Sequence, residues 1–219
     1  MRSITEKLIE LRVRDKEFTV FGSYLHRYEL NAALSEEEAL RIEEKYRFAL
    51  PEDYRWFMTN MGNGGAGPFY GIFPLGMNDD GHALASWEKG GLVGALDEPF
   101  QHAEAWNLPS SFWEAEPDPE GVSESEEDRL WEAWDRKLEH EYWNPSVMQG
   151  AIPICHEGCA LRDWLVVCGP STGNIWRDMR ADNEGIALLK DAKGAPMSFS
   201  DWYISWLHAC LNEVSSTNA

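Results

Sequence analysis

Basic residues, cysteines and long apolar runs are all scarce in this sequence. No stretch approaches the roughly 18 apolar residues of a membrane-spanning helix, so no membrane span is expected. Residues 1–18 carry charges every few positions and no apolar core segment, which argues against a secretory signal peptide. The four cysteines are few for this length and unevenly spaced, which predicts reduced thiols in a cytoplasmic protein: Cys155, Cys159, Cys168 and Cys210.

The scarcity of basic residues leaves a strongly acidic chain. The 219 residues include 19 Lys and Arg against 38 Asp and Glu, a net charge of −19. Such a charge repels nucleic acid and anionic membranes and attracts basic proteins, although a solvated acidic surface with no partner is the simpler alternative. Apolar residues make up 43% of the chain, so we expect a folded protein with about one domain.

A glycine-rich segment, residues 62–67 (GNGGAG), has the spacing G-x-G-x-x-G of dinucleotide-binding loops. Those loops follow a strand and lead into a helix, whose N-terminus holds the pyrophosphate. Here the order is reversed. Apolar residues at helical spacing predict a helix over residues 51–61, and the aromatic, β-branched residues 69–73 predict a strand. The segment therefore predicts a structural turn with positive φ, and no cofactor is expected.

Two clusters could hold a metal, but each has a simpler explanation. Asp79-Asp80-Gly81-His82 has the composition of a turn and lacks the spacing of a ligand set. Cys155, His156 and Cys159 could begin a zinc site, but no second ligand pair follows at a suitable interval. We expect residues 156–158 to join two buried strands, over 151–155 and 161–168, and we expect no metal site.

Residues 169–173 (GPSTG) match the nucleophile elbow G-x-S-x-G around Ser171. An elbow must lead into a helix, whose first amides help to stabilise the oxyanion. Residues 174–177 predict a strand instead. Asp191 and His208 follow in the required order, but His208 lies within a predicted amphipathic helix and leaves little room for a hydrolase sheet. A hydrolase is the less favoured interpretation, and no catalytic residue is assigned.

Other elements are predicted from capping and periodicity. Residues 18–30 suggest an irregular segment or short strand, and residues 185–190 suggest a further strand. Helices are expected after three capping boxes: Ser3 with Glu6, Ser35 with Glu38, and Ser123 with Glu126. A last helix is expected after Ser198, which caps it together with Asp201.

The acidic charge is concentrated in residues 97–150. Residues 114–141 contain twelve acidic and three basic residues, a net charge of −9. The first part should be a mobile loop. The helix after Ser123 has Trp131, Trp134, Leu138 and Tyr142 at three- and four-residue steps, and its tryptophans should dock it on the core. Its polar face is the candidate partner-binding surface, although most charged faces are merely solvated: Glu126, Glu127, Asp128, Glu132, Asp135 and Glu139.

Several of these segments together resemble the SUKH superfamily, which contains bacterial immunity proteins and a fungal regulator of cell-wall synthesis. The resemblance spans roughly residues 25–212 in the same order. It is carried by the helix after Ser35, Leu50-Pro51-Glu52-Asp53-Tyr54 with Phe57, residues 62–68, Leu165-Val166-Val167 before Gly169-Pro170, Gly173-Asn174-Ile175-Trp176, and Phe199 with Trp202, Trp206 and Leu207.

The resemblance implies an α+β fold with one mixed, largely antiparallel sheet flanked by helices. It implies a single domain over residues 1–219 and no catalytic centre, and residues 97–150, which match least well, would be an acidic insertion. In bacterial members it implies binding and inhibition of a cognate toxin, often a nuclease. The sequence thus predicts a cytoplasmic bacterial immunity protein for a basic toxin, or alternatively a regulatory or scaffold protein of the same fold without a toxin.

Overall fold

The computed structural model describes residues 3–79 and 84–217, which form an α+β fold with two antiparallel sheets. The larger sheet has the order β3-β4-β5-β6, and the smaller one pairs β1 with β2. The α+β class is confirmed, but the pairs between these named strands are all antiparallel and the second sheet was not predicted. The strands are β1 Met77–Asp79, β2 Leu84–Ser86, β3 Ala151–Gly158, β4 Leu161–Val166, β5 Ile175–Asp178 and β6 Ile186–Leu188.

The helices begin close to where the capping residues predict. Ser3 and Ser35 each form a complete capping box, and Ser198 and Asp201 exchange hydrogen bonds at the start of the last helix. Residues 18–30 contain a one-turn helix, which the sequence did not predict. The helices are α1 Ile4–Arg14, α2 Ser23–His26, α3 Glu36–Tyr46, α4 Glu52–Asn60, α5 Trp87–Gly90, α6 Ser110–Trp113, α7 Glu124–Glu141 and α8 Phe199–Thr217, with short 3₁₀ turns at Pro145–Met148 and Arg180–Asp182.

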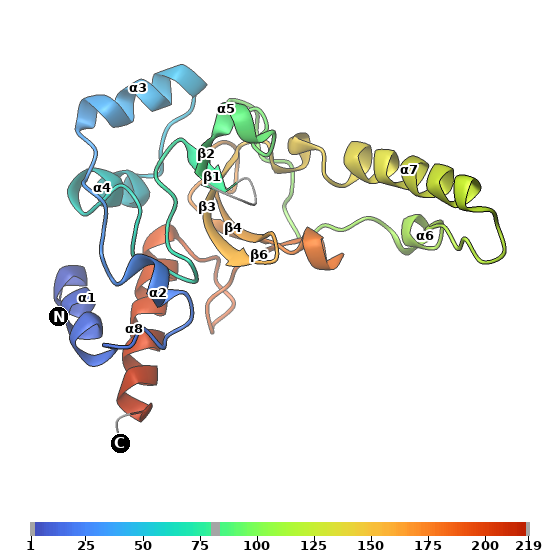
Figure 1. Ribbon diagram of the computed structural model, residues 1–219. Coiled ribbons are helices and arrows are strands. Elements are labelled where there is room, and N and C mark those ends of the chain that lie inside the picture. The colour runs from blue at the N-terminus through green and yellow to red at the C-terminus, as the bar shows by residue number, and fades with distance from the viewer. Residues whose placement is uncertain (1–2, 80–83, 218–219) are drawn as a thin grey trace.

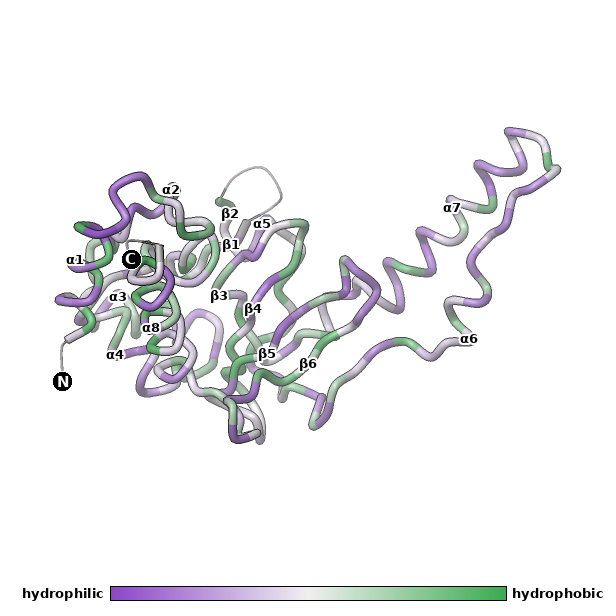
Figure 2. Tube along the Cα trace, turned by 90° about the horizontal axis from the view of Figure 1, so that it is seen from below, coloured by the Kyte–Doolittle hydropathy of each residue, from purple (hydrophilic) through white to green (hydrophobic). Residues whose placement is uncertain are grey.

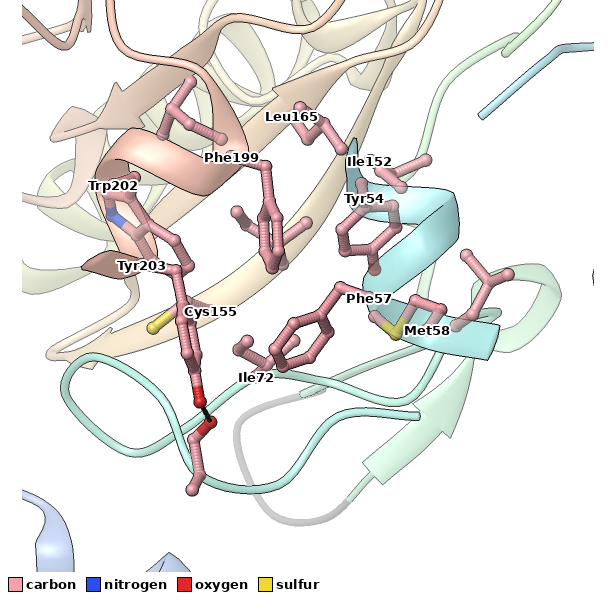
Figure 3. Packing of buried hydrophobic residues seen from close by; sticks show 14 of the residues in the cluster. Tyr54, Phe57, Met58, Ile72, Ile152, Cys155, Leu165, Phe199, Trp202 and Tyr203 are labelled. Carbon is pink, nitrogen blue, oxygen red and sulfur yellow. Dashed lines mark hydrogen bonds between the residues drawn. The ribbon is translucent and has the colours of Figure 1, made fainter. Parts of the chain in front are cut away.

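The main core lies where α4 and α8 cover one face of the larger sheet (Figure 3). The ring centroids of Tyr54 and Phe199 are 4.8 Å apart and nearly perpendicular, and those of Phe57 and Tyr203 are also 4.8 Å apart. Side chains alternate between the two faces of a strand. Trp164 on β4 therefore belongs to a second apolar cluster on the opposite face, and both faces of the sheet are covered.

The glycine-rich loop ties α4 to two neighbouring segments. The Gly65 amide donates to the Ile72 carbonyl oxygen, and the Ala66 amide donates to the Glu29 carbonyl oxygen. Tyr203 on α8 points its hydroxyl toward this loop and donates to the Ala66 carbonyl oxygen over 3.0 Å (Figure 3). Gly64 and Gly65 have φ of 79° and 99°, so the predicted positive-φ turn is confirmed.

Three predicted connections differ in the structure. Residues 69–73 do not form the predicted strand, because positive φ at Phe69 and Gly71 turns the chain and leaves Ile72 as a single bridge residue. Residues 156–158 are not the predicted turn. They continue β3 with an irregular register, and the chain reverses at Cys159 and Ala160, whose φ values are both positive. Ser171 does lie in a turn between two strands, as predicted.

The prediction that α7 docks on the core is wrong. Helices α6 and α7 lie side by side and project away from the rest of the molecule (Figures 1 and 2). Trp134 is buried against Phe112 and Trp113, at centroid distances of 5.0 and 6.4 Å, and it belongs to neither core cluster. The apolar face of α7 is therefore covered by α6.

A candidate partner-binding surface on the acidic arm

We call residues 110–142 the acidic arm; they comprise α6, the connecting loop and α7. Ser123 occupies the N-cap position in an extended conformation, but its side chain makes no capping hydrogen bond, so the predicted box with Glu126 is wrong. The helix start is instead favoured by three acidic residues in its first turn, which interact well with the positive end of the helix dipole.

Four of the six predicted contact residues lie along one side of α7. Asp128, Glu132, Asp135 and Glu139 follow one another at steps of four, three and four residues, and all four are exposed. We call these four residues the acidic stripe. Glu126 is exposed but lies outside the stripe, while Glu127 is half-buried on the side of the helix that faces α6.

The stripe is hardly neutralised by the protein itself. Arg136 contacts Glu132 at 3.7 Å, with both side chains largely exposed, and such pairs contribute little. Within the described residues, no salt bridge engages Asp128, Asp135 or Glu139. Lys137 points the other way, with its Nζ atom 4.1 Å from the ring centroid of Phe112. The stripe therefore keeps its negative charge available to a partner.

The base of the arm is fixed to the sheet by a buried arginine. Arg180 forms a bidentate pair with Asp178, at 2.9 and 2.7 Å, and donates to the Tyr142 carbonyl oxygen at 2.6 Å. The Tyr142 hydroxyl accepts from the Gly185 amide, and burial raises the pKa of that hydroxyl. No pattern in the sequence predicted this anchor, since Asp178 and Arg180 look like ordinary surface residues.

The most perturbed carboxyl group lies elsewhere, between β3, β4 and β5. Burial, and then the nearby Asp163, raise the pKa of Glu157 to about 8. Arg177 contacts both carboxylates, at 2.6 Å to Glu157 and 2.9 Å to Asp163, and the Trp202 indole also donates to Asp163. No pattern in the sequence predicted this cluster either. The cluster links three strands to α8. Its charged side chains pair with one another and are not left free for a ligand.

The candidate nucleotide and zinc sites are not supported by the geometry. The amides of Gly64, Gly65 and Ala66 already donate to protein carbonyl groups, so none is free to hold a phosphate. Cys155 is buried with its thiol 3.0 Å from the Pro68 carbonyl oxygen, whereas Cys159 is exposed. In the described part of the chain, no three His, Cys, Asp or Glu residues are grouped as metal ligands. Asp80, Gly81 and His82 lie outside the described residues.

The elbow around Ser171 lacks its partners. The turn leads into strand β5, so no helix N-terminus follows the serine. Asp191 accepts hydrogen bonds from the amides of Lys193 and Ala195 within its own turn. His208 lies 2.9 Å from the Lys7 Nζ atom, where α8 packs beside α1. Asp191 and His208 are therefore engaged with groups other than Ser171.

The α+β fold and the projecting acidic arm define the architecture, and comparison with known families gives the assignment. The chain belongs to the SMI1/KNR4 family (SUKH-1), which it matches over residues 33–187. This membership supports a role as an immunity protein or a related regulator. No curated protein and no solved structure matches the chain. Among the described helices, none is long and apolar enough to span a membrane.

Proposed function

We propose that this protein is a non-catalytic immunity protein that binds a cognate toxin and inhibits it in the cytoplasm. The acidic stripe on a projecting helix carries the proposal, because it offers an unneutralised surface clear of the rest of the molecule (Figure 2). Family membership supports the same role. We also infer that residues 97–150 are an insertion into a single domain of residues 1–219.

The physical basis is charge complementarity. A nuclease must present Lys and Arg to the phosphates of its substrate, so an acidic helix can occupy the same surface. Opposite charges also accelerate association by steering the two proteins together. Asp128 and Glu139 are eleven residues apart, so the stripe is about 16 Å long at 1.5 Å per residue. A basic toxin, for example a nuclease, is therefore the proposed partner, rather than nucleic acid or a membrane.

Titration calorimetry against the toxin encoded beside the gene tests this proposal. Reversing three charges with Asp128→Lys, Glu132→Lys and Asp135→Lys should weaken binding by about 100-fold or more, given typical coupling energies of close charge pairs. A matched control reverses three exposed acids away from the arm: Glu17, Glu37 and Glu44. The control variant has the same net charge as the arm variant. It therefore corrects for the loss of long-range attraction between the whole protein and the toxin.

The outcomes separate the claims. If the variant with three reversed charges on the arm binds the toxin as tightly as the natural protein does, the acidic stripe is not the binding surface. If no toxin is encoded nearby, or the neighbouring toxin does not bind at all, the alternative of a regulatory or scaffold protein is favoured.

A further inference from the structure

A concave surface lies at the other end of the molecule from the acidic arm. It has a volume of about 740 Å³ and is formed by the start of α4, the turn between β4 and β5, and the start of α8. Figures 1 and 2 show that α4 and α7 lie at opposite ends of the molecule. Trp56 lines this cavity with 52% of its surface exposed, and Pro51 adds a second apolar surface.

The charges that line the cavity are all negative. Glu52 and Asp53 contribute carboxylates, and no Lys or Arg side chain is among the lining residues. Glu52 is exposed and forms no salt bridge with any residue that the structure describes. The nearby Arg55 does not neutralise it, because its guanidinium pairs with Glu36 and Glu43 instead. The lining of the cavity therefore carries a net negative charge.

The N-terminus of α8 would ordinarily attract an anion to this place. Its first amides are already engaged. Ser200 donates its amide proton to Asp53 Oδ2 at 2.9 Å, and Asp201 donates to Ser198 Oγ at 3.1 Å. The lining still offers the Glu52 carboxylate and the side-chain oxygen of Asn174 as acceptors, together with the aromatic ring of Trp56. This combination favours a cation with several hydrogen-bond donors.

We propose that the cavity binds an arginine side chain of a basic partner protein. A guanidinium group stacks on tryptophan, pairs with a carboxylate in bidentate geometry and has five N–H donors for the remaining acceptors. Free arginine fits less well, because its own carboxylate would be repelled by Glu52 and Asp53. The proposal extends the proposed function, on which it rests only in taking the partner to be a basic protein.

An NMR titration with the full chain and a blocked peptide, acetyl-Gly-Arg-Gly-amide, tests the proposal without any toxin. The peptide should shift the indole Nε1–H resonance that Trp56→Leu removes. Both Glu52→Gln and Trp56→Leu should weaken peptide binding by about five- to tenfold, as expected for partly exposed cation–π and charge contacts. The neutral citrulline peptide should bind at least as weakly as the variants do.

Two controls keep the result interpretable. The arm variant with three reversed charges should bind the peptide as the natural protein does, so failure of the toxin hypothesis would not affect this test. Trp56→Leu should keep its melting temperature, because the ring is half-exposed. The proposal would be overturned if Glu52→Gln or Trp56→Leu bound the peptide as tightly as the natural protein does. It would also be overturned if the natural protein bound the citrulline peptide as tightly as the arginine peptide, or bound free L-arginine more tightly.

Discussion

At the scale of single residues, Arg180 has the largest predicted effect on stability. Its side chain is 2% exposed and that of Asp178 is 3% exposed. Arg180→Ala should lower the free energy of unfolding by about 3–5 kcal/mol, because it leaves a buried carboxylate unpaired and the Tyr142 carbonyl without its donor. Urea denaturation measures this loss. The double variant Arg180→Met with Asp178→Leu should recover much of it, and a loss below about 1 kcal/mol for Arg180→Ala would contradict the account.

Glu157 gives a prediction about pH. Its pKa is about 8 in the folded protein, against about 4.3 in an unfolded chain. The folded state therefore holds a proton that the unfolded state releases, and the natural protein loses stability as pH rises from about 5 to 8. Glu157→Gln cannot release that proton, so its stability relative to the natural protein should increase over this range.

Urea midpoints at pH 5 and pH 8.5 measure that difference for both proteins. His26, whose pKa burial lowers to about 4, titrates equally in both and cancels. Parallel pH profiles for the two proteins would show that Glu157 is not protonated in the folded state.

Gly65 and Gly194 form a matched pair for testing the glycine-rich loop. Both have positive φ, 99° and 85°. A Cβ atom at Gly65 would lie 2.6 Å from the Glu29 carbonyl oxygen, whereas one at Gly194 would have nothing within 4 Å. Gly194→Ala should cost about 1–2 kcal/mol from backbone strain alone, and Gly65→Ala at least about 2 kcal/mol more. Equal melting temperatures of the two variants would contradict a structural role for the loop.

At the scale of elements, the acidic arm should unfold independently of the rest of the protein. Trp134→Ala removes the residue that holds α7 against Phe112 and Trp113. Hydrogen exchange of the α7 amides should become at least about tenfold faster, while exchange in the sheet stays unchanged. Leu130→Ala, at a partly exposed position on the same helix, is the control. Equal acceleration in the sheet would mean that the arm belongs to the cooperative core.

The sequence predicted the helices and strands better than it predicted the surfaces against which they pack. Periodic tryptophans showed that α7 has an apolar face, but periodicity does not say which surface covers that face, and Phe112 on α6 covers it. In the same way, the aromatic residues 69–73 favoured a strand, whereas positive φ at Phe69 and Gly71 turned the chain. The anchor at Arg180 could not be predicted, because its burial arises only when residues distant in the sequence come together.

At the scale of the whole molecule, charge is distributed unevenly. Residues 114–141 carry −9 of the net −19, and they lie in an element that projects from the body. The family and the α+β class could both be predicted from the sequence, because they depend on short motifs in a fixed order along the chain. Individual side-chain contacts could not be predicted in this way. For the candidate surface, the sequence predicted the helix correctly. It did not show that Glu127 faces α6 and therefore lies apart from the acidic stripe.

The central claim is that this protein neutralises a toxin through the acidic stripe, and survival of cells that produce the neighbouring toxin domain tests it most directly. Cells that also produce the natural protein, or the control with Glu17, Glu37 and Glu44 reversed, should survive. Cells that produce the variant with Asp128, Glu132 and Asp135 reversed should die, although the variant folds normally. Equal protection by both variants, or no protection by the natural protein, would contradict the account.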